Sequence, residues 1–150
     1  MKTEGNKNKP EKNKNSLICI DITSEVNVIK NIELIIFDID GVLTDGTISI
    51  SETKLQSKSL KLRDLDYLNL MKREGYKIAA ITGESGKITE YFQEKIHWDY
   101  FREGCKEKKS ALIEACHLLH VEPQNTCYVG DGIYDLAALK VAGIAACPSD

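Results

Sequence analysis

The feature that most constrains the fold is the segment FDIDGVLTDG at residues 37–46, which follows the apolar residues 34–36. The apolar run predicts a buried strand at residues 33–38, and Gly41 permits a sharp turn just beyond it. Residues two apart in a strand point to the same side, so Asp38 and Asp40 should present both carboxylates at the strand's C-terminal end. Ligands of open α/β sheets bind at this edge. Taken alone, such a pair is more typical of a strand that runs into an Asx turn.

Strands and helices alternate through the rest of the chain. The alternating residues 47–62 predict a β-hairpin with its turn near residues 52–54. Apolar runs predict strands at residues 77–82, 99–101, 126–129 and 143–148, and helical spacing predicts helices at residues 64–74, 85–95, 107–120 and 136–141. Residues 17–22 and 26–32 allow a lead-in strand. This alternation indicates right-handed βαβ units, so the expected fold class is α/β, with a Rossmann-like parallel sheet flanked by helices.

Length and composition favour one soluble domain. Residues 1–16 hold five Lys and two Glu with almost no apolar residues, which predicts a disordered tail followed by a single domain at residues 17–150. The net charge of −3 gives no indication of nucleic-acid binding. The sequence has no apolar run of membrane-spanning length and no signal-peptide core, so no membrane association is expected. Five scattered cysteines without C-x-x-C spacing indicate a reducing, cytoplasmic location.

Four further polar residues fall where the predicted strands end or the following helices begin, and they should share one crevice with the first pair. An aspartate nucleophile beside a second carboxylic acid suits phosphoryl transfer through an aspartyl-phosphate. A hydroxyl and an ammonium can hold phosphate oxygens, and a group of carboxylates can bind Mg²⁺. The four residues are Thr82, Lys108, Asp131 and Asp135.

With these residues in place, the chain resembles the haloacid dehalogenase superfamily of phosphotransferases. FDIDGVLTDG is similar to its first motif, ITGE to its second, the Lys108 region to its third and GDGIYD to its fourth. The resemblance implies a Mg²⁺-dependent phosphatase in which Asp38 is the nucleophile and Asp40 the general acid/base. It also implies metal binding by Asp38, Asp131 and the carbonyl of Asp40. The remaining implied roles are phosphate binding by Thr82, Gly83 and Lys108, and support of the metal site by Asp135.

The segments between these motifs leave no room for a cap domain. Only a hairpin lies between residues 44 and 64, and DGVLTDG and the ending GIAACPSD resemble the capless branch. That branch includes 3-deoxy-octulosonate (KDO) 8-phosphate phosphatases, KDN or sialic acid 9-phosphate phosphatases, and the C-terminal domains of animal CMP-sialic acid synthetases. The resemblance implies a 3-deoxy-2-keto sugar acid phosphate as substrate. It also implies a homotetramer whose hairpins form a barrel and complete neighbouring sites. Ile48, Ile50 and Leu60 are the hairpin's apolar positions, and we expect a small domain without a cap to leave them uncovered, which favours an interface there.

Two residues bear on the choice of substrate. Glu84 stands where octulosonate phosphatases usually carry Arg, and Lys95 follows eleven residues later. This pair resembles the nine-carbon branch, in which it helps to recognise the sugar acid. The competing interpretation, of equal weight, is a surface Glu at a helix start and a solvated Lys near the helix end, where their charges suit the helix dipole.

Several departures from the family pattern qualify these expectations. Gly132 stands where relatives often have a second Asp, although Asp135 keeps the D-x-x-x-D spacing, and Leu65 and Asp66 replace a glycine-containing turn. Relatives continue with a G-G-x-G-x-x-R-E tail that reaches a site, so this chain is either truncated or lacks tail-dependent binding. The alternatives are therefore a non-catalytic oligomerisation domain, like that of the synthetases, and an inactive truncated homologue. Lys109 is a competing choice for the phosphate-binding lysine.

Overall fold

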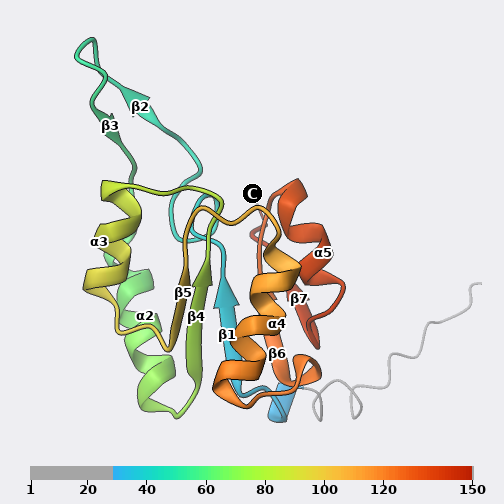
Figure 1. Ribbon diagram of the computed structural model, residues 1–150. Coiled ribbons are helices and arrows are strands. Elements are labelled where there is room, and N and C mark those ends of the chain that lie inside the picture. Colours follow the sequence, from blue (N-terminus) through green and yellow to red (C-terminus); the bar gives the residue numbers. More distant parts are fainter. Residues whose placement is uncertain (1–28, 150) are drawn as a thin grey trace, which may run out of the picture.

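The computed structural model describes residues 29–149 and folds them around a five-stranded parallel sheet (Figure 1). The strand order β5-β4-β1-β6-β7 places β1, which the predicted carboxylate pair follows, at the centre. The predicted α/β class is therefore confirmed. The strands are β1 (Leu34–Phe37), β4 (Lys77–Ile81), β5 (Tyr100–Arg102), β6 (Thr126–Val129) and β7 (Ile144–Ala146).

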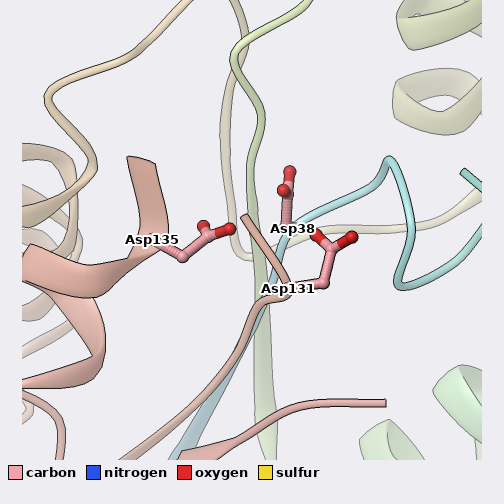
Figure 2. A group of neighbouring side chains, drawn as sticks. All are labelled: Asp38, Asp131 and Asp135. Carbon is pink, nitrogen blue, oxygen red and sulfur yellow. The ribbon is translucent and has the colours of Figure 1, made fainter. Parts of the chain in front are cut away.

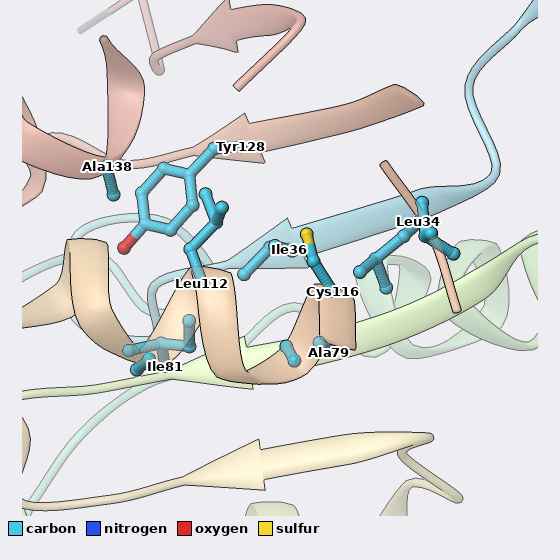
Figure 3. Packing of buried hydrophobic residues seen from close by; sticks show 11 residues of the cluster. Leu34, Ile36, Ala79, Ile81, Leu112, Cys116, Tyr128 and Ala138 are labelled. Carbon is cyan, nitrogen blue, oxygen red and sulfur yellow. The ribbon is translucent and has the colours of Figure 1, made fainter. Parts of the chain in front are cut away.

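Helices cover both faces of this sheet, because the strand side chains alternate between two apolar cores. In β4, Ile78 and Ala80 belong to the core beneath α2 and α3, whereas Ala79 and Ile81 belong to the core beneath α4 and α5. Figure 3 shows the second core, in which Leu112 of α4 lies beside the buried strand residues. The helices are α2 (Leu62–Arg73), α3 (Lys87–Lys95), α4 (Lys108–Leu119) and α5 (Leu136–Leu139).

The predicted hairpin stands above the C-terminal edge of the sheet (Figure 1). Its arms are β2 (Ser49–Ile50) and β3 (Gln56–Ser57), which pair antiparallel, and an antiparallel bridge between Thr44 and Leu60 closes its base. Ile48 and Ile50 are exposed, as expected for uncovered apolar positions. The expectation for Leu60 is wrong, because this side chain is partly buried against the core beneath α2 and α3.

The predicted boundaries hold to within a few residues. The α4 helix ends at Leu119, one residue before the predicted end, because His120 adopts a left-handed conformation (φ 54°), and Pro123 begins a separate 3₁₀ turn, η1 (Pro123–Asn125). The last predicted helix, at residues 136–141, is shorter in the structure. It is the single-turn α5, which follows directly after the 3₁₀ turn η2 (Ile133–Asp135).

The start of the chain differs from expectation where the structure describes it. Residues 29–30 are helical rather than part of a lead-in strand. Because β1 is already flanked by β4 and β6, a lead-in strand could not pair with β1 itself. The predicted tail at residues 1–16 and the apolar stretch at residues 17–22 lie outside the described residues. Within residues 29–149, every helix is too short or too polar to reach across a bilayer.

Candidate active site

The loop after β1 fixes the two aspartates of the first motif. Asp38 is buried, and its Oδ1 accepts a hydrogen bond of 2.7 Å from the Ile39 N–H. Thr44 closes the loop, because its buried hydroxyl accepts from the Gly41 N–H at 3.3 Å and donates to the Ile39 carbonyl at 3.4 Å. The loop therefore turns back on itself just beyond Asp40.

A glycine is needed at position 41 for two reasons. Its φ of +81° lies in the left-handed region, which residues other than glycine rarely adopt. In addition, a Cβ at this position would lie 1.9 Å from Oδ2 of Asp131. The missing side chain thus lets the loop after β1 approach the loop after β6, which brings their carboxylates to one place.

Lys108, the first residue of α4, bridges two buried carboxylates. Its Nζ lies 2.7 Å from Oδ2 of Asp38 and 2.8 Å from Oδ1 of Asp135, and only 3% of the Lys108 side chain is exposed. Burying an ammonium is costly unless it is paired and hydrogen-bonded, and two carboxylates meet that condition here. Of the two lysines considered for phosphate binding, Lys108 is in the cluster, whereas Lys109 is exposed.

Asp135 is held by three donors and is fully buried. Besides Lys108, the Tyr128 hydroxyl donates to Oδ1 at 2.7 Å and the Gly132 N–H donates to Oδ2 at 2.9 Å. Tyr128 lies in β6 within the core beneath α4 and α5, so the apolar core and the charged site share one side chain. Sequence reasoning did not identify Tyr128 as a site residue. Its inward position in a buried strand, one residue before the strand ends, was the available signal.

Three carboxylates gather at the ends of β1 and β6. Oxygen atoms of Asp38, Asp131 and Asp135 all lie within 4.8 Å of one another, and Figure 2 shows Asp131 and Asp135 on either side of Asp38. Asp131 is exposed, while the other two are buried. Because the oxygens of Asp135 already accept from three donors, Asp38 and Asp131 are the members best able to hold a cation. An oxygen set of this kind suits a hard dication.

Burial dominates the electrostatics of Asp38. Desolvation raises the pKa of its carboxyl from the ordinary value of 3.8 to about 6, although the hydrogen bond and charge of Lys108 act in the opposite direction. Asp135 adds a like charge that also raises this pKa. A buried carboxylate whose charge is only partly balanced is a favourable place for a cation or for a group that reacts with the carboxylate.

Thr82, at the end of β4, is fully buried, and its Oγ1 accepts a hydrogen bond of 3.2 Å from the Glu84 N–H. Thr82 and Gly83 therefore lie at the same sheet edge as Asp38. Glu84 and Lys95 are both exposed and flank α3 at opposite ends. At about 1.5 Å of rise per residue, the nine-residue helix separates them by more than about 12 Å. The structure does not bring these two residues together within one subunit.

Lys58, in the return arm of the hairpin, contacts the site from above. Its Nζ lies 2.5 Å from Oδ1 of Asp40, and the exposed fractions of the two side chains are 7% and 28%. Sequence reasoning assigned Lys58 no role. Leu60, two residues on in the same arm, packs inward, so Lys58 in register with it points inward as well. The sequence did not reveal this orientation, because Leu60 was expected to be uncovered.

A cavity of about 320 Å³ lies between the hairpin and the start of α3. Lys54, Lys58 and Lys87 line it together with Glu84, so positive charge exceeds negative charge there. A larger hollow of about 690 Å³ lies over residues 101–107 and contains none of the clustered carboxylates.

Comparison with known proteins agrees with this geometry. Residues 60–143 match the haloacid dehalogenase-like hydrolase family. The 3-deoxy-D-manno-octulosonate 8-phosphate phosphatase of Escherichia coli K12 is 28% identical over 121 residues, which cover 81% of this chain and 64% of that protein. The chain thus spans just under two thirds of the length of this relative.

Solved structures give the same picture. One is the 3-deoxy-D-manno-octulosonate 8-phosphate phosphatase of Moraxella catarrhalis in complex with magnesium, phosphate and KDO. It matches this chain with a TM-score of 0.76 and 28% sequence identity, and the match covers 81% of this chain and 70% of that protein. The cobalt-bound enzyme from Haemophilus influenzae has a TM-score of 0.77 and 27% identity, covering 82% and 72%. This chain therefore belongs to the haloacid dehalogenase-like hydrolase family, in the capless branch that contains these octulosonate 8-phosphate phosphatases.

Proposed function

We propose that this chain is a Mg²⁺-dependent phosphomonoesterase that acts on the phosphate ester of a 3-deoxy-2-keto sugar acid. The observation that carries the proposal is the position of Lys108 between Asp38 and Asp135, with Asp131, which follows β6, beside them. This arrangement offers a nucleophile, a cation site and a phosphate-binding ammonium at one edge of the sheet. The similarity to octulosonate 8-phosphate phosphatases supports the substrate class.

The proposed reaction has two steps. In the first, an Asp38 carboxylate oxygen attacks phosphorus, the bond from phosphorus to the sugar oxygen breaks, and Asp40 gives that oxygen a proton. In the second, Asp40 takes a proton from water, the water oxygen attacks phosphorus, and the bond to Asp38 breaks. Thr82, Gly83 and Lys108 hold the phosphoryl oxygens throughout.

The metal site follows from the same geometry. Asp38, Asp131 and the carbonyl oxygen of Asp40 are the groups proposed to hold Mg²⁺, with Asp135 supporting them through Lys108. When bound, the ion would neutralise charge on the transferring phosphoryl group. Addition of Mg²⁺ should also raise the thermal unfolding midpoint, because an ion that binds only the folded state stabilises it.

Release of phosphate from a panel of esters tests the proposal. KDO 8-phosphate, KDN 9-phosphate and sialic acid 9-phosphate are supplied with and without Mg²⁺, and turnover is expected only with the metal. Asp38→Asn should abolish turnover while the protein stays folded, and Asp40→Asn should lower it by about 10²–10⁴-fold. Full activity in Asp38→Asn protein would contradict the mechanism. A folded oligomer that releases no phosphate from any ester would favour the oligomerisation domain instead.

We also propose that the protein is a homotetramer and that it is located in the cytoplasm. Ile48, Ile50 and Leu55 are exposed on the hairpin, which supports a homotetramer formed through this element. Such an assembly could bring Lys95 of one subunit to the site of another, where it would meet the substrate carboxylate. The four cysteines in the described residues are free thiols, which supports a reducing cytoplasm. Finally, we propose that residues 1–16 form a tail and that residues 17–150 form one domain.

A further inference from the structure

The contact between Lys58 and Asp40 joins two elements that are eighteen residues apart. One partner lies in the return arm of the hairpin and the other in the loop after the central strand, with 2.5 Å between Nζ and Oδ1. The lysine side chain is only 7% exposed, so it does not have the freedom of a solvated surface lysine. A buried ammonium needs a partner, and Asp40 is its ion-pair partner among the described residues.

The surroundings of Lys58 reinforce this pairing. Leu60, two residues on, is packed against the core, which holds the arm down over the site. The other charged residues around the adjoining cavity are Lys54, Lys87 and Glu84. The position of the arm places the Lys58 ammonium within hydrogen-bond distance of Asp40.

A lysine ammonium only donates hydrogen bonds, so the Oδ1 atom of Asp40 must accept in this contact. When Asp40 carries a proton, that proton must therefore lie on Oδ2. Fixing one oxygen in this way selects which oxygen exchanges protons and restricts the rotation of the carboxyl group. General acids act only when the proton lies within hydrogen-bond reach of the leaving atom, so this restriction favours transfer.

We propose that Lys58 is a positioning residue that holds the Asp40 carboxyl for proton transfer through Oδ2, an inference that rests on the proposed phosphatase function. In the first step the Oδ2 proton moves to the sugar oxygen as its bond to phosphorus breaks. In the second step Oδ2 takes a proton from the attacking water. Lys58 keeps its own proton and its bond to Oδ1 in both steps.

Two esters that differ in their leaving group test this role. The leaving oxygen of KDO 8-phosphate or KDN 9-phosphate is an alkoxide that needs a proton, whereas p-nitrophenolate leaves without one. We therefore expect Lys58→Met to lower kcat/KM for the better sugar-acid ester by about tenfold or more, part of the 10²–10⁴-fold that a placed acid contributes. This loss should lie in kcat, with KM within about threefold of wild type. For p-nitrophenyl phosphate, kcat/KM should stay within about threefold.

Two further variants complete the design. Lys58→Arg keeps a charged donor and should recover part of the lost kcat, whereas Lys61→Met removes an exposed lysine three residues away and should match wild type. Circular dichroism checks that each variant is folded. We expect Lys58→Met to fold, because the Asp40 side chain is 28% exposed and water can solvate its carboxylate when the ammonium is absent.

The outcomes separate this inference from the proposed function. Equal losses of kcat/KM on both esters would overturn the positioning role, because kcat/KM reports the first step, in which only the sugar-acid ester needs the proton. A sugar-acid loss confined to KM would also overturn it, in favour of a contact with the substrate carboxylate. Wild-type activity in Lys58→Met would also overturn it. A wild-type protein that hydrolyses neither ester with Mg²⁺ would overturn the proposed function, and the positioning role with it.

Discussion

The Nζ atom of Lys108 lies 2.7 Å from Oδ2 of Asp38, and both side chains are almost completely buried. The contact joins the first residue of α4 to the end of β1, so it ties together two elements on which the site depends. Because Lys108 also contacts Asp135, its removal leaves two buried carboxylates without their shared partner. This relationship makes Lys108 important for stability as well as for its proposed role in phosphate binding.

Replacing Lys108 should therefore destabilise the protein. Breaking a buried ion pair by removing one partner typically costs about 3–5 kcal/mol, and we expect a loss of this size for Lys108→Met in urea unfolding. Phosphate release should fall below detection at the same time. The matched control is Lys109→Met, which removes the exposed neighbouring lysine and should leave both quantities near wild type. Equal effects of the two substitutions would show that the buried contact has no special importance.

Tyr128→Phe isolates the hydrogen bond on Asp135. The substitution keeps the ring in the core and removes only the hydroxyl that donates to Oδ1 at 2.7 Å. Hydrogen bonds to charged groups contribute about 1.5–3 kcal/mol, so the free energy of unfolding should fall by about this amount. Since Asp135 then positions Lys108 less firmly, kcat should fall severalfold with little change in KM. Tyr67→Phe, at an exposed position on α2, is the control. An unchanged unfolding free energy in Tyr128→Phe would contradict the prediction.

The raised pKa of Asp38 predicts a pH dependence of stability. The folded protein keeps the Asp38 proton up to about pH 6, whereas the unfolded chain releases it near the ordinary value of 3.8. The folded state therefore binds more protons between about pH 4 and 6, and stability must fall as pH rises through this window. A shift of this size corresponds to about 3 kcal/mol.

Asp38→Asn removes the titrating group, so the variant should gain stability relative to metal-free wild type as pH rises from 4 to 6. Above about pH 6 the difference in unfolding free energy between the two proteins should stay constant. Urea unfolding of both proteins at a series of pH values, in the presence of a chelator, measures this difference. A difference that is constant from pH 4 to 8 would mean that the Asp38 pKa is close to its ordinary value.

Sequence reasoning succeeded where local patterns determine structure. The apolar residues 34–36 and 78–81 indicated the central strands, and the polar residues that follow them indicated the edge of the sheet where the carboxylates gather. Sequence reasoning also favoured Lys108 over Lys109, and of the two only Lys108 is buried beside Asp38. These features depend on the spacing of apolar residues and on the common edge at which parallel strands end, and both can be inferred from the order of residues along the chain.

Contacts between distant segments were less predictable. The pairings of Lys58 with Asp40 and of Tyr128 with Asp135 depend on how the hairpin folds over the sheet and on which strand residues face α4. The shortened α5 arises from a local backbone conformation that apolar spacing does not reveal. Leu60 was expected to be uncovered, because the closure of the hairpin base against the core is also a long-range contact.

The proposed assembly through the hairpin predicts that a charged substitution at Ile50 disrupts the tetramer. Ile50 is 66% exposed near the hairpin turn, and a tetramer formed through this element should bury it. We expect wild-type protein to be tetrameric by light scattering at micromolar concentration and Ile50→Lys to be monomeric, because an unpaired charge in an apolar interface is costly. Leu118→Lys changes a residue of similar exposure on α4 and should remain tetrameric. A monodisperse wild-type monomer would contradict the proposed assembly.

Glu84 should influence the choice between eight- and nine-carbon substrates. It is exposed beside the lysine-lined cavity, where its carboxylate can accept hydrogen bonds from hydroxyl or amine groups of a longer sugar acid. We expect a higher kcat/KM for KDN or sialic acid 9-phosphate than for KDO 8-phosphate, and Glu84→Arg should narrow or reverse this preference. Glu90→Arg makes the same charge change at an exposed position in α3 and should leave the ratio unchanged. A clear wild-type preference for the eight-carbon ester would refute the nine-carbon assignment and leave the phosphatase mechanism intact.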